Sequence, residues 1–141
     1  MKQIFSTPQD VESAFYEALE RADLDAMMDV WAEDEDIVCI HPSGPRLVGY
    51  EQVREVWARI FGSGQRLNVR LSHLVQTVSS MVAVHSVHEN IAVVNDSGSA
   101  TAVATNIYIR SAGGWRMLAH HASGTEAMPQ APTLESLQTL H

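Results

Sequence analysis

The spacing of hydrophobic residues divides this chain into two parts, with a change of period close to Leu67. Before that point, apolar residues recur every three or four positions, which is the spacing of one face of an α-helix. From residue 67 onward, apolar and polar residues largely alternate, as they do in half-buried β-strands. We therefore expect helices first and an antiparallel sheet after them, which is an α+β arrangement.

The start of the first helix is marked by Ser6-Thr7-Pro8-Gln9-Asp10. Thr7 can cap the helix, and Pro8 suits its first turn. Asp10 faces the positive end of the helix dipole. Apolar residues at helical spacing then carry this helix to about Arg21.

Two further helices and a short strand are expected before the sheet. Asp23 should cap a short helix that carries Trp31. A third helix is expected over residues 50–61, where Gly62-Ser63-Gly64 stops it. Between these two helices, residues 37–41 suit a short buried strand, and His41-Pro42-Ser43-Gly44-Pro45 predicts a loop.

The second part predicts an antiparallel meander in which three short turns join successive strands. The four strands are expected at about 67–78, 81–94, 99–110 and 115–123. Their joints are short enough for hairpins. We expect one domain over residues 1–124 and a C-terminal arm over 125–141, which contains Pro129 and Pro132.

Pairing the strands through these turns gathers polar side chains on one face of the sheet. The starting pairs are Arg110 with Trp115 and Val94 with Ser99, and a tight turn at Ser79-Ser80 adds Arg70 opposite Glu89. The face so defined carries His85, Glu89, Asn106, Tyr108, Trp115, Met117 and His121. The opposite face carries Val82, Val84, Ser86, His88, Thr105, Ile107, Ile109, Leu118 and His120.

Both faces are substantially apolar, so we expect the helices to cover one face and a partner subunit to cover the other. Buried carboxylates and imidazoles are costly unless they are paired or hydrated. Two interpretations of the polar set therefore stay open. It is either a satisfied structural network, with Glu89 paired to Arg70 or a histidine, or the lining of a pocket.

Composition narrows the classes of protein that this chain can be. The 141 residues with 45% hydrophobic content suit a single domain with a real core. A net charge of −8 argues against a nucleic-acid partner, which needs clustered Lys and Arg. The single cysteine, Cys39, lies in an apolar run and is expected to be a buried, inert thiol. No apolar run approaches the ~20 residues of a membrane span, and the N-terminus lacks a signal-peptide pattern, so we expect a cytoplasmic protein.

Three segments together carry a resemblance to a known family. They are Phe15 to Asp25, Ile40 to Gly49 with Val53 to Trp57 after it, and Gly114-Trp115 through His121 to Gly124. In this order they resemble the NTF2-like superfamily over about residues 8–124. More narrowly, they resemble its SnoaL-like and ketosteroid-isomerase-like branch. The last segment also resembles the association domain of calcium/calmodulin-dependent kinase II, a non-catalytic oligomerisation module of the same fold.

The resemblance implies a cone, in which a strongly curved antiparallel sheet wraps around a cavity with three N-terminal helices as its wall. It also implies candidate catalytic positions. Tyr16 falls where the isomerases keep an oxyanion-hole tyrosine, and His41 where they keep an aspartate base. Asn106, or Thr105 within alignment error, falls where they keep a protonated aspartic acid. Two of the three positions thus carry a different residue here.

One function compatible with these residues is proton transfer on a small, fairly apolar carbonyl compound. His41 would be the general base, and Tyr16 and Asn106 would stabilise an oxyanion. Isomerisation, dehydration and cyclisation all fit this chemistry. Polar groups that orient the base or the ligand are expected from His85, Glu89, Tyr108 and His121, and an apolar wall from Trp31, Trp57, Phe61 and Met117.

Two other functions remain open. One is a non-catalytic ligand-binding or assembly domain, a homodimer through the sheet face that carries His88 and His120. The other is a metal site, which would need His85, Glu89 and His121 together, since neighbours on a strand point to opposite faces. Because His120 and His121 are neighbours on a strand and form a poor chelate, we do not expect the metal site. The chain has no Gly-rich phosphate loop, nucleophile elbow or Cys-x-x-Cys, so nucleotide, acyl-serine and redox mechanisms have no support and we expect no cofactor.

Overall fold

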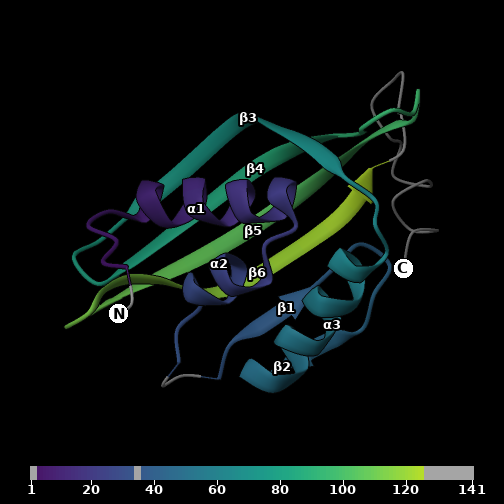
Figure 1. Cartoon of the computed structure of the whole chain (residues 1–141). Helices are drawn as coiled ribbons and strands as arrows, with labels where there is room; N and C mark the ends of the chain where they lie inside the picture. Colours follow the sequence, from purple (N-terminus) through teal and green to yellow (C-terminus); the bar gives the residue numbers. More distant parts are fainter. Residues whose placement is uncertain (1–2, 34–35, 126–141) are drawn as a thin grey trace.

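A bent sheet with helices packed inside its curve dominates the computed structural model, which describes residues 3–33 and 36–125 (Figure 1). The three helices are α1 (Pro8–Arg21), α2 (Leu24–Asp29) and α3 (Tyr50–Gly62). The six strands are β1 (Val38–Ile40), β2 (Arg46–Val48), β3 (Leu67–Val78), β4 (Val82–Val93), β5 (Ser99–Ser111) and β6 (Gly114–Thr125). They lie in the order β2-β1-β6-β5-β4-β3. The expected C-terminal arm lies almost entirely outside the described residues.

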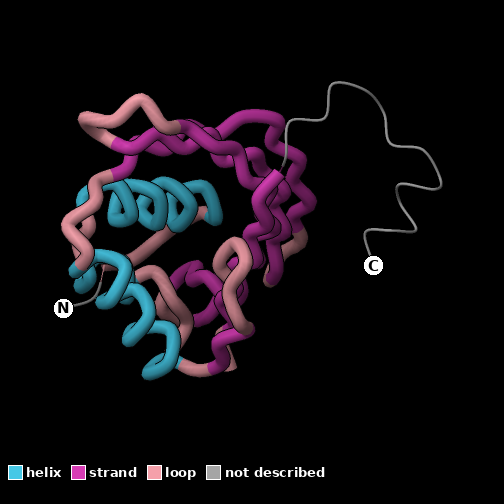
Figure 2. The backbone as a smooth tube through the Cα atoms, turned by 90° about the vertical axis from the view of Figure 1, so that its right-hand side faces the viewer, coloured by secondary structure: helices cyan, strands magenta, loops and turns pink. Residues whose placement is uncertain are grey.

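Helix α1 begins and ends as its sequence predicts. The Thr7 hydroxyl accepts a hydrogen bond of 3.1 Å from the Asp10 backbone N–H, which caps the first turn. Ala22 ends the helix in a left-handed conformation. The buried face carries Phe15 and Tyr16 and also one carboxylate, Glu12. Figure 2 shows the sheet arching over this helix.

The connection from α2 to the sheet differs from the prediction in three details. Helix α2 ends at Asp29, so Trp31 follows it and pairs with Met117 in an isolated bridge instead of lying within the helix. Strand β1 joins β6 in parallel, with Cys39 opposite His120. Strand β2 was not expected, and it pairs antiparallel with β1. Strand β2 is too short for alternation to reveal it, and the pairing of β1 with β6 joins residues far apart in the chain.

A bulge in β6 corrects the predicted face of His121. Ile107 pairs with Ala119 but Tyr108 pairs with Met117, which leaves Leu118 as an extra residue. Because side chains alternate, one extra residue exchanges the two faces beyond it. His120 therefore lies on the inner face opposite Asn106, and His121 is exposed on the outer face. The prediction that His121 faces the site is wrong.

A second bulge, in β3, corrects the position of Arg70. The register of β3 against β4 shifts between Ser72 and Val75, and His73 adopts a φ of 54° there. Leu71 lies opposite Glu89, and Arg70 lies opposite Asn90. The predicted pairing of Arg70 with Glu89 is therefore wrong.

The hairpin from β4 to β5 shows why a different register error did no harm. The predicted pair was Val94 with Ser99, but Ser99 pairs with Ala92. This shift by two residues preserves every assignment to a face. The inner face thus keeps His85, Glu89, Asn106 and Tyr108, and all four are buried. The predicted α+β cone is confirmed, with a mostly antiparallel sheet.

Candidate functional site

Four buried side chains from four elements form one continuous line of hydrogen bonds, which we call the inner network. His120 Nδ1 lies 2.5 Å from Asn106 Oδ1. The Asn106 Nδ2 amide donates to the Tyr16 hydroxyl at 2.9 Å, and that hydroxyl donates to Glu89 Oε2 at 2.6 Å. Since an amide oxygen only accepts hydrogen bonds, His120 carries its proton on Nδ1, and its Nε2 atom is unprotonated.

The inner network depends on one helix face and three neighbouring strands. Tyr16 comes from the buried face of α1, Glu89 from β4, Asn106 from β5 and His120 from β6. The side chains are between 0% and 5% exposed. A buried line of this kind is stable only when each member is partnered, because an unpaired polar group loses its hydration without compensation.

Burial favours the neutral form of both acids at one end of the network. It raises the pKa of Glu89 above its ordinary range, and the hydrogen bond from Tyr16 opposes this rise in part. Burial also raises the pKa of Tyr16 far above its usual value, and the adjacent Glu89 adds to the effect. The phenol is therefore a stable hydrogen-bond donor at any ordinary pH.

The two imidazoles at the other end are also held neutral. Burial, with His41 and His121 nearby, lowers the pKa of His120 to about 3. Burial lowers the pKa of His41 as well, although His41 is only half-buried. Both rings consequently have an unprotonated nitrogen at neutral pH, which is what a proton acceptor requires.

His41 stands beside the inner network without bonding to it. Its ring centroid lies 6.5 Å from that of His120 and 4.6 Å from that of Trp57, edge to face. The ring of Trp57 in turn lies 5.4 Å from Phe61. The His41 Nε2 atom contacts the Cys39 sulfur at 3.6 Å. Burial raises the pKa of that thiol to about 12, so Cys39 stays protonated and inert.

A second buried pair lies one helical turn before Tyr16. His85 Nδ1 lies 2.7 Å from Glu12 Oε2, and His85 is completely buried. Tyr108 packs edge-on against His85, with ring centroids 5.0 Å apart. Its hydroxyl lies near Glu12 and Asn106 without a well-formed hydrogen bond to either. Burial raises the pKa of Tyr108 well above its ordinary value.

The interior leaves several buried polar atoms without a partner among the described residues. They are the indole nitrogens of Trp31 and Trp57, Nε2 of His85 and the hydroxyl of Tyr108. Each such atom is costly in a sealed core. The polar interior is therefore only partly satisfied by the chain itself.

Most residues predicted for the site are gathered in this interior. Asn106 is hydrogen-bonded to Tyr16 and Tyr16 to Glu89, while the ring centroid of His41 lies 6.5 Å from that of His120. Phe61 packs at the edge of the same core. The other buried residues that were predicted for the site lie within this core: Trp31, Trp57, His85, Tyr108 and Met117.

Sequence reasoning missed two members of this interior, Glu12 and His120. Glu12 precedes Tyr16 by four residues, so helical spacing alone places both on one face and was a usable signal. His120 had no such signal, because only the bulge in β6 turns it inward.

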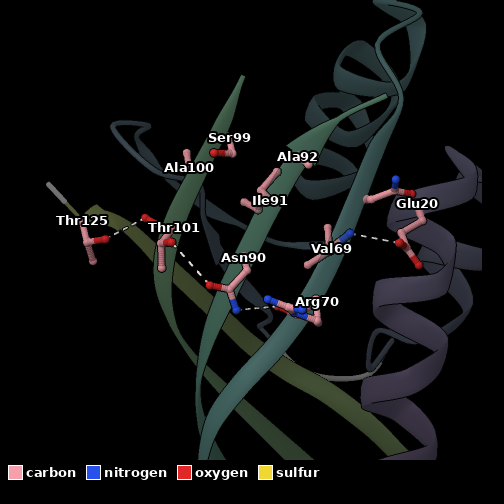
Figure 3. A pocket seen from close by; sticks show the side chains of 11 residues that line it. Glu20, Val69, Arg70, Asn90, Ile91, Ala92, Ser99, Ala100, Thr101 and Thr125 are labelled. Atoms are coloured by element: carbon pink, nitrogen blue, oxygen red, sulfur yellow. Dashed lines mark hydrogen bonds between the residues drawn. The ribbon is translucent and has the colours of Figure 1, made fainter. Parts of the chain in front are cut away.

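Two hollows described on the surface lie away from the inner network. The first, of about 740 Å³, lies at the end of β3, β4 and β5 and is lined mainly by polar residues such as Arg70, Asn90 and Thr101 (Figure 3). There Asn90 donates to the Arg70 backbone oxygen at 2.9 Å and accepts from Thr101 at 3.4 Å. The second, of about 590 Å³, lies between the N-terminal segment, α1 and α2. Neither hollow is lined by His41, Tyr16 or Asn106.

The part of the chain that the structure describes contains neither a cluster suited to a metal ion nor a helix suited to span a membrane. Among residues 3–33 and 36–125, no cluster of three or more His, Cys, Asp or Glu side chains has a geometry that holds a metal ion. Within the same residues, every helix is too short or too polar to cross a bilayer.

Comparison with known proteins agrees with this architecture. The family model of the SnoaL-like domain matches residues 9–128. A curated relative, the F-box protein SKIP8 of Arabidopsis thaliana, is 24% identical over 125 residues, which are 86% of this chain. The matched part is 52% of that relative, so the chain spans about half of its length.

Solved structures give closer matches. A candidate calcium/calmodulin-dependent protein kinase type II association domain from Thiobacillus denitrificans is 37% identical, with a TM-score of 0.79, and the match covers 89% of this chain and 100% of that one. A candidate dehydratase of the NTF2-like family from Streptomyces avermitilis is 29% identical, with a TM-score of 0.77, and the match covers 83% and 92%. The order of elements, the inner polar face and these matches together establish that the chain belongs to the SnoaL-like domain family, within the NTF2-like proteins.

Proposed function

We propose that this protein binds a small, largely apolar carbonyl compound beside the inner network and transfers protons on it, as an isomerase, dehydratase or cyclase does. The observation that carries the proposal is the inner network itself, a buried line of four polar side chains that ends beside a second neutral imidazole. Burying these four polar side chains costs free energy, and a role in proton transfer would account for keeping them in the interior.

His41 takes the role of general base in this proposal. It is half-buried, so a ligand can reach it, and its lowered pKa leaves the ring neutral at physiological pH. His120 is less suited, because a group with a pKa of about 3 holds an abstracted proton weakly. We assign His120 to the ligand-facing end of the network, where Asn106 fixes its orientation.

Tyr16 and Asn106 take the role of oxyanion stabilisers through the network. In this structure the Tyr16 hydroxyl donates to Glu89 and accepts from Asn106. An enolate oxygen at this point would compete with Glu89 for the Tyr16 proton and would gain a strong, charge-assisted hydrogen bond. Trp57, which meets His41 edge to face, and Phe61 beside Trp57 supply an apolar surface for the rest of the ligand.

The test is hydrogen exchange next to a carbonyl group. A panel of cyclic ketones is incubated with the protein in D2O, and deuterium uptake is followed by mass spectrometry. We expect catalysed uptake on at least one ketone, and a loss of at least a hundredfold in His41→Ala. His121→Ala is the matched control, because His121 is exposed on the outer face and should leave uptake unchanged. Equal rates for the wild type and His41→Ala on every ketone would contradict the proposal.

A second function, self-association, is supported by a separate observation. The turn end of the β3–β4 hairpin exposes a set of apolar side chains that we call the hairpin patch: Leu74, Val75, Val78, Met81, Val82 and Val84. Val75 is 67% exposed, which is unusual for a strand valine. The similar Thiobacillus protein is named as an association domain, which fits a homodimer through this part of the sheet.

Analytical ultracentrifugation tests the association. We expect a dimer for the wild type, and a shift to monomer in the double variant Val75→Glu with Val82→Glu. Ile4→Glu is the matched control, because Ile4 is 73% exposed but lies outside the hairpin patch. A monomeric wild type would reject the dimer and leave the proton-transfer proposal untouched.

A further inference from the structure

The larger hollow lies on the outer face of the sheet, across the strands from the inner network. Its volume of about 740 Å³ is within the range of small-molecule sites. Glu89 is buried on the inner face, so alternation directs its neighbour Asn90 outward. Asn90 lies in one row with Arg70 on β3, Thr101 on β5 and Thr125 on β6. All four residues of this row line the hollow, which the sheet therefore separates from the proposed proton-transfer site.

A second row of residues completes the floor of the hollow. Asn68, Ala92 and Ser99 lie side by side on β3, β4 and β5, two residues along each strand from the first row. Residues two apart on a strand point to the same side, so both rows share the outer face. At ~4.8 Å between strands and ~3.4 Å per residue, the floor from β3 to β5 measures about 10 Å by 7 Å. The short side chain of Ala92 lies between longer polar ones, which leaves room above it for one small molecule.

Hydrogen bonds within the floor hold Asn90 in place (Figure 3). Its Nδ2 amide donates to the Arg70 backbone oxygen and to Ser72 Oγ, both at 2.9 Å. Its Oδ1 accepts from the Thr101 hydroxyl at 3.4 Å. Both amide hydrogens are used inside the protein, so Asn90 is part of the floor and does not bind a ligand through its amide hydrogens.

Arg70 brings an uncompensated positive charge to this floor. Among the described residues, its guanidinium group makes no hydrogen bond and no ion pair. Glu20 also lines the hollow, but its Oε2 accepts from the Val69 backbone N–H at 3.0 Å. Figure 3 shows Glu20 reaching the edge of β3 from α1, whereas Arg70 lies in the first row. The charge of Arg70 is therefore available to a ligand.

The chemistry of Arg70 indicates which anion the hollow accepts. A guanidinium group offers five N–H donors in a planar fork that matches a carboxylate. One guanidinium group balances one carboxylate, whereas a phosphate group carries nearly two charges at neutral pH and would stay partly unbalanced. A small acid with a single carboxylate thus fits this row best.

Two neutral polar side chains in the second row are also uncommitted. The Asn68 amide and the Ser99 hydroxyl make no hydrogen bond to a described residue. They lie on β3 and β5, on the two sides of Ala92. Amide and hydroxyl groups both donate and accept hydrogen bonds, so they match hydroxyl groups of a ligand.

From this geometry we propose that the outer hollow is a ligand site separate from the inner network, and that it binds a small monocarboxylic acid with several hydroxyl groups, the class of the sugar acids. Arg70 holds the carboxylate through two parallel hydrogen bonds. Asn68 and Ser99 bind hydroxyl groups, and the ligand lies over Ala92. No residue that lines the hollow belongs to the inner network, so this inference goes beyond the proposed function.

Calorimetric titration with defined acids tests the inference. The probes are D-glucuronate and D-gluconate, with D-glucose as the uncharged analogue and inorganic phosphate as an anion without hydroxyl-bearing carbons. We expect at least one acid to bind with a Kd of about 1 mM or tighter. Glucose and phosphate should bind about tenfold more weakly or not at all. Arg70→Gln should weaken the acid about tenfold or more, and Arg70→Lys should keep part of the affinity because it keeps the charge.

Arg110→Gln is the matched control, because Arg110 is an exposed arginine of β5 that lines neither of the two hollows described. It should leave the affinity unchanged. Asn68→Asp should weaken binding, since it places a second negative charge beside the carboxylate. Circular dichroism and thermal melting confirm that each variant folds, which we expect because Asn68 and Arg70 are exposed.

Each contrary outcome is distinct. No saturable binding of either acid by the wild type overturns the inference. Equal affinity in the wild type and Arg70→Gln also overturns it, because the acid would then bind elsewhere. Equal affinity for phosphate and the two acids shows a site for any anion and overturns the assignment to hydroxylated acids. None of these results bears on the proton-transfer proposal, which deuterium uptake tests by itself.

Discussion

The inner and outer faces of the same four strands differ more than their sequences suggest. Thr105 and Asn106 are adjacent polar residues on β5, and His120 and His121 are adjacent histidines on β6. Yet Asn106 and His120 are buried and bonded to each other, whereas Thr105 and His121 are exposed. The inner face therefore carries polar groups where burial makes polarity costly, and the hairpin patch is apolar where exposure to water makes that unfavourable.

This inversion teaches that neither face is arranged for stability alone. A domain arranged only for stability would exchange these residue classes, since buried polar groups and exposed valines both lose free energy. Each departure is a candidate for function. The predictions below compare matched residues on the two faces.

The largest effect is expected at the centre of the inner network. Asn106→Leu keeps the branching of the side chain but leaves His120 and Tyr16 without their partner, at a cost of about 3 kcal/mol in the free energy of unfolding. Thr105→Leu, one residue away on the exposed face, should change it by less than about 0.5 kcal/mol. Urea denaturation measures both variants, and equal costs would break the contrast between the faces.

Acid should weaken the fold through His120. Its pKa is lowered from 6.5 to about 3 in the folded state, so the unfolded chain binds the proton more readily. The stability is complete above pH 6.5 and falls as pH drops toward 3, at about 1.4 kcal/mol per pH unit for one such group. His120→Gln should flatten the decline in urea midpoints between pH 7 and 4.5. His121→Gln, on the outer face, should leave the slope as it is.

The hydroxyl of Tyr16 should contribute less than the Asn106 amide. Tyr16→Phe removes the donor to Glu89 and the acceptor for Asn106, at a cost of about 1–2 kcal/mol. Tyr50, which is half-buried at the start of α3, offers the matched Tyr50→Phe control. That control should stay within about 0.5 kcal/mol. Urea denaturation measures the free energy of unfolding of both variants. A Tyr16→Phe protein as stable as the wild type would show that the hydrogen bonds of the Tyr16 hydroxyl do not stabilise the network.

The smallest effect is expected for a valine on the outer face. Val84→Thr should change the free energy of unfolding by less than about 0.5 kcal/mol, because Val84 is 36% exposed. Val87→Thr places the same hydroxyl on the inner face, where Val87 has no exposure, and should cost about 2 kcal/mol. Thermal melting at one protein concentration compares the two. Similar shifts would mean that a partner covers Val84 in solution.

The elements of this fold were predictable where local signals were strong. The Thr7-Pro8 start of α1, the glycines after α3 and the three hairpin turns are short-range features, and the structure has helices and strands close to each predicted position. Strand β2 was missed because three residues after a Pro-Gly loop are too few to show alternation, and the parallel pairing of β1 with β6 was missed because it joins residues far apart in the chain.

The candidate site was predictable only in part, and the reason is register. Shifting β4 against β5 by two residues left Glu89 and Asn106 together, because alternation is unchanged by an even shift. The bulges at His73 and Leu118 are odd shifts, and each exchanged the face of every residue beyond it. Hence Arg70 and His121 were assigned wrongly, and His120 was missed.

By itself, the sequence determined the order of helices and strands, the curved α+β architecture and the set of polar residues that alternation places within the strands. These depend on the period of hydrophobic residues and on turn chemistry, which act over a few residues. Only the tertiary structure decided which of two adjacent histidines enters the interior, and that Arg70 lies opposite Asn90 instead of Glu89. The physical reason is that one extra residue in a strand reverses its faces, and the packing of the whole sheet decides where that residue is tolerated.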